Sequence, residues 1–381
     1  MKKVFIILFV MINVLFLSSC SKNEFVKETI MLEDVFSISP YIVLHGNKKD
    51  VNNYKDSIKE EVDKILVELD SKYDNNNENS LISKINREAD KKEVEIDEET
   101  YYIISTALDV SLRTTVSGIT KYDITVYPLI KKWDFVNKYY DGIHCYAPPE
   151  VNEIMALTEL VYYGNIELTE NSIKFLKEGM MIDLGSIVKG YACDKVAKYM
   201  DNNYPNLSYI LNIGGNVLTR GYTQRNGQVD DFHVAIQTPF EENIANPNAH
   251  HIGYIKASEG KLLTVVTSGI YERYIMDFSG NMYHHILDPE TGYPIDNNIE
   301  SITIVIEDRY ESILADAYST AMFDMDFNVL FGRGYINYRI GIILITKDKK
   351  IYVTDNLKDR FVLNEEIKEY YSYQEDTNSR K

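Results

Sequence analysis

The spacing of apolar residues in the first third of the chain predicts helices. Between residues 51 and 73 the apolar positions recur every three or four residues, the pattern of one buried helix face, at Ile58, Val62, Ile65, Leu66 and Leu69. One Asp and three Asn at residues 74–77 end this pattern and indicate a polar turn. A second helix is expected over residues 98–114 and a short one over residues 81–85. The first third is therefore predicted to be rich in helix.

Beyond residue 180 the pattern changes to short apolar runs separated by Gly, Asn and Asp, which predict strands. These runs lie at residues 209–213, 233–237, 262–267, 301–306 and 340–346, after an earlier one at residues 38–44. Helices are expected over residues 188–202 and 313–325, and no repeat of fixed period is detectable. The predicted fold class is α+β, a mixed sheet body with a helix-rich N-terminal part. The charged, Tyr-rich segment 364–381 is expected to be a flexible tail.

The first residues carry an export and anchoring signal. Lys2 and Lys3 precede an apolar run over residues 4–17, which is long enough for the core of a signal peptide and short for a membrane-spanning helix. The run ends in Leu-Ser-Ser-Cys at residues 17–20, which resembles a bacterial lipobox, in which Cys20 is acylated after cleavage just before it. We expect a lipoprotein signal peptide at residues 1–19, a tether at 20–29 and a folded domain at 30–363.

These features predict a lipid-anchored protein at the cell membrane, facing outside the cytoplasm. The alternative is an uncleaved N-terminal anchor in which Cys20 occurs by chance. Both interpretations place the body of the protein outside the cytoplasm.

Composition limits what the protein can bind. The chain has 381 residues, 45% of them hydrophobic, so it can bury a core. Its formal net charge of -18 argues against a general nucleic-acid binder, so an anionic ligand needs a metal, a helix N-terminus or a few placed cations. Besides Cys20 only Cys145 and Cys193 are present, which make neither a disulfide framework nor a zinc site, although a disulfide between them stays open.

Two segments have the residue types needed for phosphate and magnesium. In the first, an apolar run leads through Gly185 and Ser186 into a predicted helix, where backbone N–H groups and Lys189 can meet a phosphate. Its alternative is a tight connection with a capping side chain. In the second, Asp316 and Thr320 stand four apart on a predicted helix, so their oxygens share one face and suit magnesium. The alternative there is a solvated Asp and a Thr bonded to its own helix.

A histidine pair is the candidate for proton transfer. His284 and His285 are adjacent, so in a strand they point to opposite faces and at most one faces a site. A neutral imidazole suits a general base, with Asp288 orienting a neighbour. The alternative is a histidine bonded to backbone at a turn. Two weaker signals are the paired glycines at residues 214–215 and the Lys-Tyr-Asp turn at residues 121–123.

Taken together and in order, these segments resemble the ApbE family, the FAD:protein FMN transferases. The family pattern runs Ser-Gly-x-x-Phe-Asp-x-Thr-x-x-Pro-Leu, Asp-Leu-Gly-Gly-Ile-Ala-Lys-Gly-Tyr, Gly-Gly, Thr-Ser-Gly-x-Tyr-x-Arg, His-Ile-x-Asp-Pro-x-Thr-Gly and Ala-Asp-Ala-x-x-Thr. This chain matches nearly all of it between residues 117 and 321. The resemblance implies an ApbE-type, T-fold-like fold over residues 30–363.

The resemblance also implies an activity and its participants. FAD would be bound with Mg²⁺, its pyrophosphate split, and FMN passed through its phosphate to a Thr or Ser hydroxyl with release of AMP. The acceptors would be exported proteins with a flavinylation motif, of the Rnf or Nqr type or other extracytoplasmic flavoproteins.

The residues implied by the resemblance fall into three groups. The metal would be held by Asp316, Thr320 and an oxygen near Ser186. His285 is the candidate catalytic residue together with Asp316, and His284 is its less favoured rival. The FAD contacts would be Tyr73, Lys121, Tyr122, Asp123, Asp183, Lys189 and Ile286.

Some positions depart from the family pattern. Ser186 replaces a Gly, Val188 an Ala, and Ile270 a residue that is often small or acidic, while residues 37–40 replace an early Met-Gly-Thr, so no FAD contact is assigned there. Two other functions stay open: an FAD pyrophosphatase that transfers the phosphate to water, and a flavin-binding or solute-binding lipoprotein without turnover. A magnesium site favours an enzyme, because a pure binder has little need of a metal beside the pyrophosphate.

Overall fold

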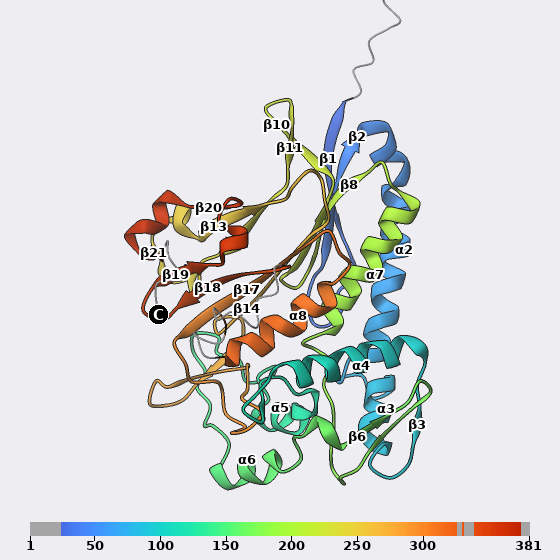
Figure 1. Cartoon of the computed structure of the whole chain (residues 1–381), viewed down its shortest axis with the longest axis vertical. Helices are drawn as coiled ribbons and strands as arrows, with labels where there is room; N and C mark the ends of the chain where they lie inside the picture. The colour runs from blue at the N-terminus through green and yellow to red at the C-terminus, as the bar shows by residue number, and fades with distance from the viewer. Residues whose placement is uncertain (1–23, 326–329, 331–338, 375–381) are drawn as a thin grey trace, which may run out of the picture.

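A nine-stranded sheet forms the centre of the protein in the computed structural model, which describes residues 24–325, 330 and 339–374. Its strand order is β1-β2-β8-β9-β14-β17-β18-β19-β21 (Figure 1). Neighbouring strands are antiparallel except β19 and β21, which are parallel. The strands are β1 Phe25–Met31, β2 Tyr41–Asn47, β8 Ser208–Ile213, β9 Asn216–Arg220, β14 Leu263–Gly269, β17 Ile299–Glu307, β18 Ile340–Thr346, β19 Lys350–Val353 and β21 Ser372–Gln374.

The central strands of this sheet are buried on both faces. Helices α2 (Lys48–Tyr73), α7 (Val188–Asn203) and α8 (Ser312–Ala321) cover one face (Figure 1). A three-stranded sheet, β12-β13-β20, packs on the other, with bounds His233–Gln237, His251–Lys256 and Phe361–Leu363. Because successive residues of a strand point to opposite faces, Val265 packs against the second sheet while Val266 packs on the side of α8.

The smaller elements gather largely at the ends of this core. Helices α3 (Leu81–Glu88), α4 (Glu98–Arg113), α5 (Tyr127–Trp133) and α6 (Val151–Thr158) lie together at the end opposite β10 and β11 (Figure 1). The remaining strands form a three-stranded sheet and three hairpins: β3 Val94–Glu95, β6 Ile166–Leu168 and β7 Ser172–Phe175; β4 Thr115–Val116 and β5 Ile119–Thr120; β10 Tyr222–Arg225 and β11 Gln228–Asp231; β15 Tyr274–Met276 and β16 Met282–His284.

The helix-rich N-terminal part is confirmed. Helices α2, α3 and α4 occupy the three predicted regions and each begins at a side-chain cap: Asn47, Ser80 and Asp97 accept backbone N–H bonds from the first turn. The predicted strands at residues 233–237 and 340–346 are β12 and β18. The run at residues 38–44 becomes β2 only from residue 41, because residues 35–38 form a tight turn closed by paired backbone bonds between Val35 and Ile38.

The tether prediction for residues 20–29 is wrong from residue 25 onward. Strand β1 begins at Phe25 and pairs with β2 along its whole length. It is an edge strand with one face in solvent, so exposed Lys27 and Thr29 alternate with half-buried Val26 and Glu28, and this alternation makes the segment look polar.

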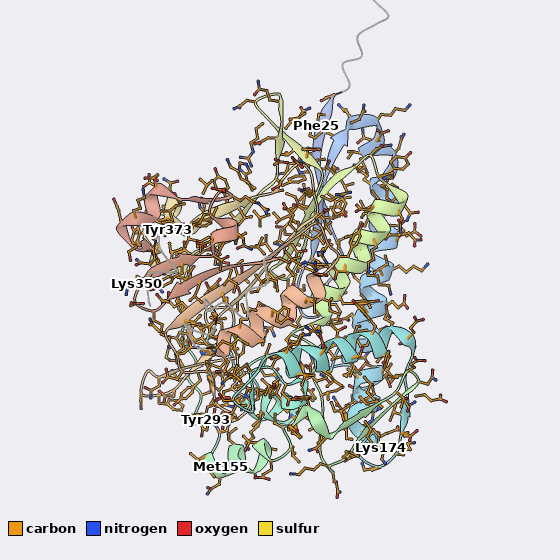
Figure 2. The ribbon with its side chains drawn as sticks, viewed as in Figure 1. Phe25, Met155, Lys174, Tyr293, Lys350 and Tyr373 are labelled. Atoms are coloured by element: carbon orange, nitrogen blue, oxygen red, sulfur yellow. The ribbon has the colours of Figure 1, made fainter. Side chains whose placement is uncertain are left out.

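The prediction of a flexible tail is also wrong for the described residues 364–374. A 3₁₀ helix, η7 (Glu365–Glu369), is followed by β21, which pairs with β19, and Lys350 and Tyr373 mark these two neighbouring strands (Figure 2). Ile367 and Tyr371 are buried against the second sheet. Widely spaced apolar residues are enough to bury this segment, although its composition is charged.

The predicted signal peptide and Cys20 lie outside the described residues. Among the residues that the structure describes, no helix is both long and apolar enough to cross a membrane. Cys145 and Cys193 are free thiols in the structure, so the disulfide left open between them is not formed.

Candidate active site

The turn before α7 is held in place by the carboxylate of Asp183. Its Oδ1 accepts a hydrogen bond from Asn75 Nδ2 at 2.9 Å, and its Oδ2 accepts one from the backbone N–H of Gly185 at 2.8 Å. Asn86 Nδ2 supports the same turn by donating to Ile182 O at 2.9 Å. Burial raises the pKa of Asp183, and these hydrogen bonds oppose that shift. Asp183 therefore ties the end of α2 to the start of α7.

Asn75 and Asn86 were missed in the sequence. The Asn run at residues 74–77 indicated only a turn, and nothing in its spacing pointed to Asp183, which lies more than one hundred residues away. A polar run directly after a buried helix was the one available signal.

Asp316 joins α8 to the first turn of α7. Its Oδ2 accepts the backbone N–H of Gly190 at 2.9 Å, and its Oδ1 accepts Asn216 Nδ2 at 3.4 Å. Helix α7 has no side-chain cap at Ile187, so Asp316 satisfies one of its free N–H groups from another element. Asp316 is buried, and no ion pair to it forms within residues 24–325 and 339–374. A buried carboxylate bonded only to neutral donors is a suitable ligand for a cation.

Asp194 makes the reciprocal contact. Its Oδ1 and Oδ2 accept hydrogen bonds from the backbone N–H groups of Ser312 and Ile313, at 2.9 and 3.0 Å. These two residues begin α8. Burial raises the pKa of Asp194 to about 6 against these hydrogen bonds. Asp194 and Asp316 thus each accept backbone N–H groups from the other's helix, which joins α7 to α8.

Gly190 allows this close approach. A Cβ at this position would lie 2.2 Å from Ser312 O and 2.7 Å from the Asp316 Cβ. Only a residue without a side chain lets the backbone N–H of α7 reach the carboxylate on α8.

Tyr122 and Lys121 connect the polar turn of residues 121–123 to this helix pair. Tyr122 is buried, and its hydroxyl lies 3.0 Å from Ser186 Oγ. The charges of Asp183 and Asp316 both act on Tyr122, which adds to the raising of its pKa by burial. Lys121 pairs with Asp324, at 3.0 Å, in the short helix η5 (Met322–Asp324) that follows α8. Asp183, Ser186, Tyr122 and Asp316 are therefore brought together as predicted.

Lys189 and Arg273 supply positive charge near the candidate catalytic histidine. Lys189 Nζ donates to Gly185 O, across the turn before α7. Burial lowers the pKa of His285 to about 3, and the charges of Arg273 and Lys189 add to this effect. The same two cations act on Glu272, so the loop before β15 and the first turn of α7 lie within electrostatic reach. Glu272 and Arg273 lie in a segment whose pattern was noted, but neither was predicted as a site residue.

The hydrogen bonds distinguish the two histidines. His285 Nδ1 lies 3.0 Å from Arg273 O, and because a carbonyl can only accept, Nδ1 carries the proton and Nε2 has a free lone pair. No bond to Nε2 forms within the described part of the chain. His284 is buried, with Nε2 on Ile295 O at 2.9 Å and Nδ1 accepting Ile286 N–H at 3.3 Å. This arrangement favours His285 as a base and gives His284 a structural role.

Three predicted FAD contacts have buried side chains that are held by contacts within the protein. Tyr73 is buried at the end of α2 with its hydroxyl 3.0 Å from Thr100 Oγ1, because it faces the start of α4. Asp123 is buried, and both its oxygens accept bonds from the protein, two from Thr125 and one from Tyr163 N–H. Ile286 packs in the apolar cluster beneath β17 and α8. These side chains pack inside the protein, and their role as FAD contacts stays a prediction.

The residues around Asp316 fit a hard cation such as Mg²⁺. Thr320 follows one turn later on α8, as predicted, and is half-buried. Asn216, beside Asp316, is buried and its Oδ1 has no hydrogen-bond partner within the described residues. A carboxylate and a hydroxyl are oxygen donors that Mg²⁺ prefers, and the unpartnered amide oxygen keeps their surroundings polar. No group of three or more His, Cys, Asp or Glu side chains suited to a metal occurs among the residues described.

Comparison with known proteins gives matches over most of the chain. The model of the ApbE family matches residues 37–331. The FAD:protein FMN transferase of Klebsiella pneumoniae is 30% identical over 290 residues, which cover 75% of this chain and 81% of that protein. The FAD:protein FMN transferase of Treponema pallidum is 23% identical, with 89% and 88% of the two chains covered.

Solved structures share the fold. The crystal structure of the ApbE protein of Thermotoga maritima has a TM-score of 0.70 and 27% identity, and covers 88% of this chain and 99% of that one. The flavin transferase ApbE of Vibrio cholerae has a TM-score of 0.67 at 21% identity, with 88% and 100% covered. The predicted ApbE-type α+β fold is confirmed.

Proposed function

This chain belongs to the ApbE family and is an FAD:protein FMN transferase, and we propose that it transfers FMN at the site between the Asp183 turn and Asp316. One observation carries this location: Asp316 on α8 bonds to the first turn of α7, which begins directly after the Asp183 turn. Residues more than one hundred positions apart in the chain therefore meet at one place.

Asp316, Thr320 and an oxygen near Ser186 would hold Mg²⁺, which supplies charge neutralisation at the diphosphate of FAD. Lys189 and Arg273 add positive charge on the side of His285. These cations matter because the chain as a whole is strongly acidic and repels a diphosphate. Tyr122, bonded to Ser186, would position the turn that faces the ligand.

His285 would act on the acceptor. The hydroxyl oxygen of an acceptor Thr or Ser attacks the phosphorus of the FMN half of FAD, and its proton passes to His285 Nε2. The bond from that phosphorus to the bridging oxygen breaks, and AMP leaves with that oxygen. The pKa of about 3 keeps His285 neutral in the free enzyme. The negative charge of a bound diphosphate would favour the protonated imidazole and so raise this pKa from the low value that burial sets.

The acceptors we propose are exported proteins, and the enzyme itself would be held at the outer side of the cell membrane by a lipid on Cys20. The N-terminal sequence supports this localisation, because a short apolar run ends in a lipobox-like segment. Acceptors of the Rnf or Nqr type fit that side of the membrane.

The test is incubation of the protein with FAD, Mg²⁺ and an acceptor that carries a flavinylation motif. We expect a fluorescent acceptor band after denaturing electrophoresis, and AMP in equal amount. Free FMN and AMP formed without acceptor at the same rate would instead identify a pyrophosphatase, and intact FAD would identify a binding protein. Asp316→Asn should abolish the band while circular dichroism stays unchanged; a variant that still needs Mg²⁺ and transfers at the wild-type rate would contradict the metal assignment.

A further inference from the structure

Asn216 is buried beside Asp316, and only one end of its side-chain amide is hydrogen-bonded within the described residues. It is the first residue of β9, directly after Gly214 and Gly215, and its side chain is 2% exposed. Its Nδ2 donates to Asp316 Oδ1 at 3.4 Å, whereas its Oδ1 has no hydrogen-bond partner among the described residues. An unpartnered buried amide oxygen destabilises a folded protein, so its retention calls for a role.

We propose that Asn216 is a positioning residue that orients the carboxylate of Asp316 toward the cation. This inference rests on the proposed function, which places the cation at Asp316. The carboxylate has two anchors from separate elements, the backbone N–H of Gly190 at Oδ2 and the amide of Asn216 at Oδ1. The terminal torsion angle of an Asp side chain has a broad distribution. Hydrogen bonds to both carboxylate oxygens restrict it and so fix the plane of the carboxylate.

The backbone beneath Asn216 is rigid. Strand β9 is paired on both sides, with Ile213 of β8 and Val266 of β14 opposite Asn216. The turn before it has Gly214 and Gly215 at φ values of 57° and 86°, which favour glycine. A side chain on such a platform places its amide reproducibly, and a group that fixes a metal ligand needs this property.

Thr219 provides a matched control on the same strand. It is three residues further along β9, is fully buried, and its hydroxyl also has no partner within the described residues. No hydrogen bond links it to Asp316. Residues three apart on a strand point to opposite faces, so Thr219 faces the second sheet and Thr219→Val reports on the stability of β9 alone. If Asn216 acts only through the stability of β9, both variants should change Mn²⁺ binding to the same extent.

The experiment measures Mn²⁺ binding to the full chain by electron paramagnetic resonance, with saturating FAD. We expect Asn216→Leu to raise the Mn²⁺ Kd about 10-fold to 100-fold, and Thr219→Val to keep it within about twofold of wild type. FAD affinity without metal, measured by flavin fluorescence, should be unchanged in both. Mn²⁺ affinity of Asn216→Leu equal to that of wild type overturns the positioning role.

Asp316→Asn separates this inference from the proposed function. If Asp316→Asn binds Mn²⁺ as wild type does, the cation site itself is wrong. If Asp316→Asn loses Mn²⁺ and Asn216→Leu keeps it, only the positioning role is wrong.

Asn216→Asp decides the question if Asn216→Leu does not fold. It keeps the shape of the side chain and sets a second carboxylate beside Asp316 Oδ1. We expect a lower thermal unfolding midpoint than wild type without metal, and a larger rise on adding Mn²⁺, because a cation relieves the repulsion. A rise equal to that of wild type overturns the proposal.

Discussion

Substitution of Gly190 by alanine tests whether the spacing of α7 and α8 determines the site. The added methyl would lie 2.2 Å from Ser312 O and 2.7 Å from the Asp316 Cβ. A backbone carbonyl of a packed helix has no alternative rotamer, so α8 must move away by about 1 Å to restore an ordinary contact. This movement also lengthens the hydrogen bond from Gly190 N–H to Asp316.

The magnitude follows from three opposing effects. Overpacking of this kind costs about 1–3 kcal/mol. Weakening the charged hydrogen bond costs about 1 kcal/mol more, and the better helix propensity of alanine offsets about 1 kcal/mol. We therefore expect Gly190→Ala to lower the free energy of unfolding by about 2 kcal/mol, and to weaken Mn²⁺ binding because the carboxylate of Asp316 shifts.

Urea unfolding followed by circular dichroism measures the first effect, and Mn²⁺ titration measures the second. Asn202→Ala, at an exposed position of the same helix, is the control for a change of helix propensity alone. Unchanged or increased stability in Gly190→Ala would refute the close contact. Lower stability with wild-type Mn²⁺ affinity would refute the link between helix spacing and the orientation of Asp316.

Three further predictions concern catalysis, pH and the C-terminal segment. His285→Ala should slow transfer about 10²-fold to 10⁴-fold with FAD affinity retained, whereas His284→Ala should mainly lower stability. Transfer rates are measured in stopped assays, and equal rate losses in the two variants would contradict the assignment of His285 as the base. Burial raises the pKa of Asp194 from 3.8 to about 6. Protonated Asp194 therefore makes its full contribution to the free energy of unfolding below pH 3.8, and this contribution is lost as the pH rises through 6. The difference in unfolding free energy between wild type and Asp194→Asn should therefore change by roughly 3 kcal/mol between pH 4 and 7. If the unfolding free energies of the two proteins instead vary with pH in parallel, Asp194 does not carry a buried charge above pH 6. Deleting residues 364–374 should lower the urea midpoint, because Ile367 and its neighbours lose burial worth about 1.5–3 kcal/mol per side chain; an unchanged midpoint would mean that this segment contributes nothing.

The helices and central strands could be predicted because their periodicity is local. Helix α2 shows its buried face in the spacing of Ile58, Val62 and Leu66, and β18 is one continuous apolar run. Strands β1 and β21 were not predicted, because they lie at or near the edges of the sheet and few of their side chains are buried. Their pairing partners, not their own composition, make them strands.

The same division holds for the site. The order of motifs along the chain determined the family, because residue types and local spacing are properties of the sequence itself. The same motifs led to the prediction that Asp183, Asp316 and His285 act at the site. The partners of these residues depend on folding. Asn75 meets Asp183, and Asn216 meets Asp316, only after helices and strands distant in the chain have packed. Tertiary structure also decided that His284 is bonded to backbone while His285 keeps one nitrogen free, since two adjacent and identical residues differ only in their surroundings.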